Sequence, residues 1–164
     1  MTVTAVHKDT DARLMTITAE FTATPERVWQ LWADPRQLER WWGPPGYPAT
    51  VTAHDLTPGG RVAYHMTGPT GDQPAGWWEV VEVNPPNTLV FHDGFADEHG
   101  QPNPDFPVTT ARVTIAGIGD GRTRMSIQSH FPDDQAMEKI LAMGMEEGMK
   151  LAMGQIDAIL AEDR

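Results

Sequence analysis

Residues 24–45, TPERVWQLWADPRQLERWWGPP, constrain the fold most, because helix-start signals occur twice within this short stretch. Thr24-Pro25 supplies a side chain that can cap a helix and a proline that suits the first helical position. Asp34-Pro35 repeats the pattern, so it ends one helix and caps the next. Residues 41–45, WWGPP, then form a stiff turn. The segment predicts two short helices and a tryptophan-rich corner at the entrance of an apolar pocket.

Strands are predicted on both sides of these helices. Residues 13–21 alternate between apolar and polar side chains, which indicates a half-buried strand. Three hairpins with turns rich in Gly, Pro and Asn are expected after the helices, from residues 49–56 and 61–66, 77–83 and 89–93, and 109–118 and 123–131. Residues 94–107 are rich in Gly, Pro, Asn and Asp and predict a long loop of the kind that often covers a site.

One long helix is expected at the C-terminus, from a cap at Asp133 to about Glu162. Its apolar stripe would lie across the sheet and comprises Met137, Leu141, Met145, Leu151, Ala152, Ile156 and Ile159. The predicted fold class is therefore α+β, with a curved seven-stranded antiparallel sheet wrapped around a long C-terminal helix and two short helices between the first and second strands.

Length and composition favour one domain over residues 1–164, with residues 1–11 as a loose arm. The formal charge of −11 disfavours nucleic acid and anionic membranes as partners, because both are bound through clustered Lys and Arg. With no cysteine, disulfides and thiolate chemistry are excluded. The polar N-terminus is unlike a signal peptide, so a cytoplasmic protein is expected.

Five segments, in this order along the chain, carry a resemblance to a known family. They are TPERVW (24–29) with WWGP (41–44), DLTPGGR (55–61), EVNPPNTLVF (82–91), TRMSI (123–127) and GMEEG (144–148). With these segments the chain resembles the START-like (SRPBCC, helix-grip) superfamily, and within it the Hsp90-ATPase-activator-homologue-like (AHSA1-like) branch. Two positions depart from the pattern: Met145 stands where the branch usually has Trp, and Thr57 where it usually has Arg.

The resemblance implies a START/Bet v 1-like helix-grip fold with a cavity between the sheet and the C-terminal helix. It leaves function open, since the superfamily includes carriers, cyclases, hydroxylase subunits and co-chaperones. Without a recognisable catalytic motif, a small hydrophobic molecule, lipid-, polyketide- or aromatic-like, is the expected partner, with no cofactor. The alternatives are a polyketide cyclase or aromatase that uses Tyr64, and a co-chaperone-like module acting on an Hsp90-type ATPase. The paired tryptophans and the long terminal helix also suggest a homodimer.

Candidate ligand-binding residues are the aromatic and methionine side chains expected to face the cavity. Five of the nine methionines lie in the C-terminal helix and could line a ligand or simply fill the core. Tyr64 could orient a ligand through its hydroxyl or be a satisfied core residue. Of the adjacent Trp77 and Trp78, we expect Trp78 to face inward. The full set is Trp32, Trp41, Trp42, Tyr64, Met66, Trp78, Phe91, Phe95, Met125, Met137, Met145 and Met149.

Two further features of the sequence bear on function. His92, Asp93, Asp97, Glu98 and His99 form an acidic and imidazole-bearing cluster, but their spacing fits no common metal motif, so solvated charge is the preferred interpretation. Gly144 and Gly148 each disfavour a helix by about 1 kcal/mol relative to Ala, which indicates either a close approach of the sheet or room for a cavity.

Overall fold

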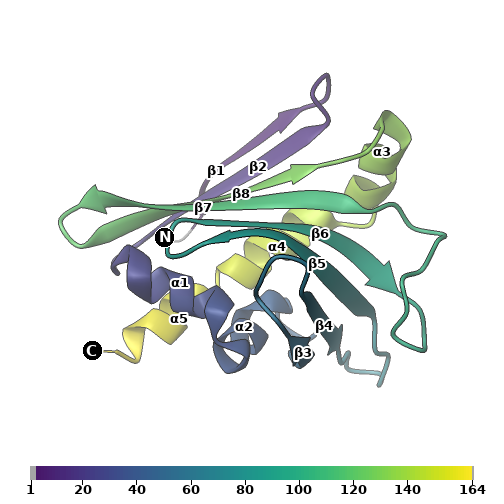
Figure 1. The fold of residues 1–164 in the computed structure, drawn as a ribbon, viewed down its shortest axis with the longest axis horizontal. Coiled ribbons are helices and arrows are strands. Elements are labelled where there is room, and N and C mark those ends of the chain that lie inside the picture. Colours follow the sequence, from purple (N-terminus) through teal and green to yellow (C-terminus); the bar gives the residue numbers. More distant parts are fainter. Residues whose placement is uncertain (1–2, 164) are drawn as a thin grey trace.

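A computed structural model of the chain describes residues 3–163 and contains one antiparallel sheet and five helices within that range (Figure 1). The strand order across the sheet is β1-β2-β8-β7-β6-β5-β4-β3. The strands are β1 (Val3–Asp9), β2 (Leu14–Phe21), β3 (Ala49–His54), β4 (Arg61–Met66), β5 (Ala75–Asn84), β6 (Thr88–Ala96), β7 (Thr109–Gly119) and β8 (Arg122–His130). The predicted α+β class and large antiparallel sheet are confirmed.

The sheet has eight strands in this range, and the prediction of seven is wrong. The additional strand is β1, which pairs antiparallel with β2, so the prediction of a loose arm over residues 1–11 fails for Val3–Asp9. Residues 1 and 2 lie outside the described residues. Most side chains of β1 are exposed, with only Val3, Val6 and Asp9 partly buried. A strand held mainly by backbone pairing leaves little hydrophobic pattern in the sequence.

The two short helices are confirmed as α1 (Pro25–Ala33) and α2 (Pro35–Trp42). The side chain of Thr24 accepts a hydrogen bond from the backbone N–H of Arg27 at 3.2 Å. Asp34 does the same for Arg36 at 2.9 Å, and each helix begins with its proline. Both predicted caps are therefore formed, and they fix the turn between the two helices.

The C-terminal region consists of three helices, so the prediction of one continuous helix is wrong. These are α3 (Asp134–Ala142), α4 (Met145–Met153) and α5 (Ile156–Ala161), which follow one another diagonally across one face of the sheet (Figure 1). The predicted cap at Asp133 is formed with the N–H of Ala136 at 2.7 Å. Gly144 interrupts the helix between α3 and α4. Its φ of 89° is a left-handed conformation that an α-helix cannot contain.

A cluster of aromatic rings fills the space where α1, α2 and the sheet meet. Trp32 lies at its centre, 4.8 Å from the ring of Trp41, 5.7 Å from Trp42 and 5.9 Å from Trp78. Trp78 stacks on Phe91 at 4.0 Å. Trp78 has no exposed surface and faces inward as predicted. All of these rings are buried, so the cluster forms the hydrophobic core between the two helices and the sheet.

Candidate functional site

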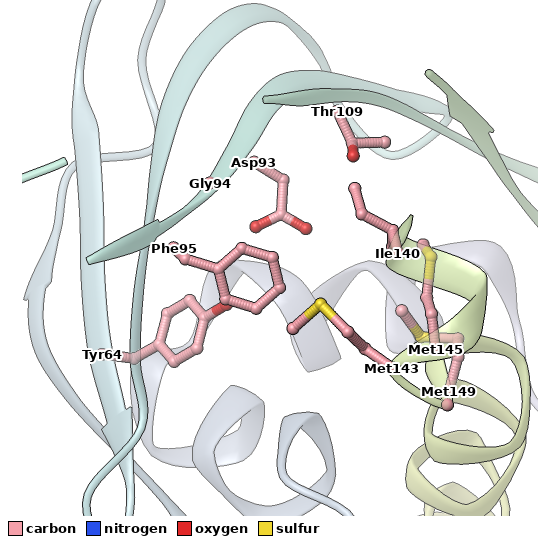
Figure 2. A pocket seen from close by; sticks show the side chains of 10 residues that line it. Tyr64, Asp93, Gly94, Phe95, Thr109, Ile140, Met143, Met145 and Met149 are labelled. Carbon is pink, nitrogen blue, oxygen red and sulfur yellow. The ribbon is translucent and has the colours of Figure 1, made fainter. Parts of the chain in front are cut away.

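A cavity with mainly apolar walls and two titratable side chains, Tyr64 and Asp93, lies beside this cluster, near the junction of α3 and α4 (Figure 2). Its volume is about 220 Å³. It is lined from the sheet by Tyr64, Asp93, Gly94, Phe95 and Thr109, and from the helices by Ile140, Met143, Gly144, Met145 and Met149. We call this cavity the helix-junction pocket.

Cross-strand register explains why a tyrosine and a phenylalanine meet at the pocket. Tyr64 of β4 pairs with Gly76 of β5, which in turn pairs with Phe95 of β6. Direct partners in adjacent strands project from the same face of a sheet. A Cβ atom at Gly76 would lie 2.3 Å from the Tyr64 hydroxyl oxygen, so the tyrosine lies over a position that has no side chain. Glycine at this place lets the two rings share one wall.

The next lateral row brings polar groups to the same wall. Trp78 pairs with Asp93, and Asp93 pairs with Thr109 of β7. Because Trp78 is an inner residue, the register places the carboxyl group of Asp93 and the hydroxyl of Thr109 on the inner face as well. Figure 2 shows the carboxylate of Asp93 pointing into the pocket.

The broken helix forms the opposite wall. Ile140 belongs to the last turns of α3, whereas Met145 and Met149 lie one turn apart at the start of α4. Gly144 itself lines the pocket, so the left-handed break lies at the cavity and directs the two helices around it. Met143 also lines the pocket although half of its surface is exposed, which places this side chain at the opening.

Asp93 is electrostatically unusual. Burial raises the pKa of its carboxyl group from 3.8 to about 7. Among residues 3–163 the carboxylate has no hydrogen bond or ion pair, and it interacts with Tyr64 through its charge. The side chain is partly accessible through the pocket, but the surrounding protein atoms still remove it from most of the solvent. Near neutral pH this carboxyl group therefore exists in both protonation states.

The Tyr64 hydroxyl is held neutral and lies near two indole N–H groups. Burial and the charge of Asp93 raise the pKa of Tyr64 well above its ordinary value of 10. The indole N–H groups of Trp42 and Trp78 lower the pKa of Tyr64 in part, because they favour a negative oxygen, but neither reaches hydrogen-bond geometry with any described atom. The Tyr64 hydroxyl has no hydrogen-bond acceptor among residues 3–163, so its proton is free to donate elsewhere.

The sequence of this chain matches one known protein family. The family described as "Activator of Hsp90 ATPase homolog 1-like protein" matches residues 22–161. The chain belongs to this family. The AHSA1-like resemblance drawn from the five sequence segments is therefore confirmed.

Two solved structures share the fold with this chain over nearly their full length. Protein Ms6760 from Mycobacterium smegmatis is 51% identical, with 96% of each chain covered and a TM-score of 0.89. A protein from Arthrobacter aurescens is 52% identical, with 98% of this chain and 93% of that chain covered and a TM-score of 0.94.

A more distant structure shares the fold alone. DynU16, from the dynemicin biosynthetic locus, is 19% identical over 93% of this chain and 48% of its own, with a TM-score of 0.67. Among curated proteins, none matches this chain.

The structure brings only part of the predicted site residues to the pocket. Tyr64, Phe95, Met145 and Met149 line it. Trp41 and Trp42, expected near the pocket entrance, are buried in the aromatic cluster and do not line this pocket. The other predicted residues pack in or against the core without lining the pocket: Trp32, Met66, Trp78, Phe91, Met125 and Met137.

Several lining residues were not among the predicted ligand contacts, chiefly Asp93, Thr109, Ile140 and Met143. The sequence pattern places Asp93 only in the acidic and imidazole-bearing cluster of residues 92–99. The alternation of Phe91, Asp93 and Phe95 was a usable signal, because it places a carboxylate on the same face as two aromatic rings. Among residues 3–163, no group of three His, Asp or Glu side chains is arranged to hold a metal ion. No helix in that range is long and apolar enough to cross a membrane.

Proposed function

We propose that this AHSA1-like protein binds one small, mainly apolar molecule in the helix-junction pocket. The cavity of about 220 Å³ lies between an engineered cavity of about 150 Å³ that binds benzene and the lower limit of about 300 Å³ for drug-sized ligands. This volume suits a body of one or two rings. A long lipid or a multi-ring polyketide would require the pocket to open further.

The observation that carries the proposal is the shape of the pocket wall on the helical side. A left-handed glycine interrupts the helix at the cavity, and methionines stand on both sides of the break. Unbranched thioether side chains adapt to ligands of different outline. Because Met143 lies at the opening and is half exposed, rotation of this side chain offers a route of entry.

The test is occupancy of the pocket by a neutral ring-sized probe. Titration of 2-phenylethanol into isotope-labelled protein, followed by NMR, should shift the amide signals of Phe95, Thr109 and Ile140. Met145→Trp would fill the pocket with the residue that the branch usually carries and should abolish these shifts. Leu151→Trp is the matched control, because Leu151 is 49% exposed on α4 and lies outside the pocket lining. Absence of shifts in the unmodified protein would overturn the proposal.

Proton transfer is a second candidate, and one observation favours it. A carboxyl group with a pKa of about 7 beside a neutral tyrosine hydroxyl can give or take a proton at neutral pH. In such an enzyme, of the aromatase or cyclase kind, the pocket would hold a reactive carbonyl compound. For any substrate found to be converted, Asp93→Asn and Tyr64→Phe should each lower kcat. Unchanged turnover in both variants would remove this candidate.

A further inference from the structure

The pocket contains one strong acceptor that the protein does not satisfy. An ionised carboxylate accepts hydrogen bonds at both oxygens and is costly to bury without a partner. Asp93 nevertheless has no donor among residues 3–163, and its side chain points into the cavity (Figure 2). The missing partner has to come from whatever occupies the pocket.

The residues around Asp93 supply no positive charge. Tyr64 faces it from β4, Trp78 from β5 and Thr109 from β7, while the helical wall contributes Ile140 and methionines. Of these neighbours only Tyr64 is titratable, and it is held neutral.

The nearby basic groups are occupied elsewhere. Lys139 of α3 donates from Nζ to the carbonyl oxygen of Asp105 at 2.8 Å and lies 4.6 Å from the centre of the Phe106 ring. His92, adjacent to Asp93 in β6, pairs with Thr110 at 3.2 Å, in the next lateral row. Neither side chain lines the pocket.

We propose that the helix-junction pocket selects a small organic cation, namely an amine attached to a ring-sized apolar body. The ammonium group donates to the carboxylate of Asp93, and the body lies between the aromatic rings of the sheet and the methionines of the helices. This inference rests on the proposed function, since it names the chemical class of the molecule that the pocket binds.

The charges and aromatic rings around the pocket favour a cation over an anion. A carboxylate ligand would meet Asp93 with no positive group on the lining to offset the repulsion. The rings of Tyr64 and Phe95 face the same cavity, and the faces of aromatic rings attract cations. The formal charge of −11 raises the local concentration of cations further.

Tyr64 adds a second point of recognition. Its hydroxyl is held neutral and has no hydrogen-bond acceptor among residues 3–163, so its proton is available to a lone pair on the ligand body, such as a ring hydroxyl. Tyr64 is therefore assigned a positioning role, and Asp93 carries the selection for charge.

The experiment compares three probes of matched size: 2-phenylethylamine, 2-phenylethanol and phenylacetate. Affinities are measured by NMR titration at about pH 8 and about pH 6. The amine, which stays protonated at both values, should bind at least tenfold more tightly than phenylacetate. Because a carboxyl group with a pKa of about 7 is about 90% ionised at about pH 8 and about 10% at about pH 6, amine affinity should be about tenfold higher at the upper pH. The affinity of the alcohol should change less than about twofold.

A matched pair of variants separates the local charge from the overall charge. Asp93→Asn should reduce the affinity of the amine to that of the alcohol and remove its pH dependence. Asp120→Asn also removes one negative charge, but from the exposed β7–β8 turn. It should leave the affinity of the amine and its pH dependence unchanged. Amine binding that survives Asp93→Asn, tighter binding at the lower pH, or phenylacetate binding as tightly as the amine would overturn the inference. If the alcohol binds and the amine binds no better, only this inference fails, whereas failure of all three probes would overturn the proposed function as well.

Discussion

The hydroxyl group of Tyr64 occupies the space that a side chain at Gly76 would need, since a Cβ atom there would lie 2.3 Å from the hydroxyl oxygen. The two residues are direct partners across β4 and β5. One wall of the helix-junction pocket therefore depends on the absence of a single methyl group.

We predict that Gly76→Ala destabilises the protein by about 1–3 kcal/mol, because the stiff tyrosine ring has to move out of its place. Urea unfolding of the variant measures the loss. Gly117→Ala is the control, since a Cβ atom at Gly117 would make only an ordinary contact of 3.5 Å with Pro25. Equal stability of the two variants would show that Tyr64 does not need the empty position.

The two glycines of the C-terminal region should respond in opposite directions to alanine. Gly144 has a φ of 89°, and an L-residue in this conformation costs about 1–2 kcal/mol, so Gly144→Ala should lower stability. Gly148 lies within α4 without a positive φ, and a Cβ atom there would have nothing within 4 Å. Gly148→Ala should raise stability by about 0.5–1 kcal/mol. Thermal unfolding of both variants tests the pair, and a loss at Gly148 would contradict the prediction.

Asp93 should make stability fall as pH rises. Its pKa is about 7 in the folded protein and close to 3.8 when exposed, so the folded state binds more protons between these values. Unfolding free energy should therefore decrease from about pH 4 to about pH 7 and level off above it, by an amount on the order of 3 kcal/mol from this group. Chemical denaturation across this range measures the slope.

Asp93→Asn should flatten this pH dependence and be more stable than the unmodified protein at about pH 8. Binding sites often contain residues that lower stability, because those residues serve function. An ionised carboxylate that points into a cavity fits this pattern. If the variant were less stable at every pH, the carboxyl group would have a structural partner, and its assignment to ligand recognition would lose its basis.

Trp32 should be the most costly aromatic residue to truncate. Its ring contacts the rings of Trp41, Trp42 and Trp78, and it has no exposed surface. Trp32→Ala should cost about 3–5 kcal/mol, as truncation of a buried ring leaves a cavity. Met143→Ala, at a position 50% exposed, should cost far less and serves as the comparison. Similar losses in urea unfolding would show that the aromatic cluster is not the stabilising core.

Local chemistry made much of the fold predictable. Thr24, Asp34 and Asp133 were expected to cap helices, and all three do so through their own side chains. Strand β1 was missed because backbone pairing holds it, without an alternating apolar face. The break at Gly144 was missed because one glycine can be tolerated inside a helix, and the sequence does not reveal its φ.

The site was less predictable, because it depends on register between distant strands. Large aromatic side chains were expected at the pocket, yet Trp41 and Trp42 pack in the core, where burial of rings is most favourable. Asp93 reaches the pocket only because β6 pairs with β5 and β7 in one register. A shift of one residue would turn the carboxylate to the other face.

The most direct test of the account is an NMR titration of the protein with 2-phenylethylamine at about pH 8, where Asp93 is about 90% ionised. We predict saturable shifts of the Phe95, Thr109 and Ile140 amides that are lost in Met145→Trp and retained in Leu151→Trp. Shifts that are absent, or that persist equally in Met145→Trp, would contradict the claim that this pocket holds a ligand.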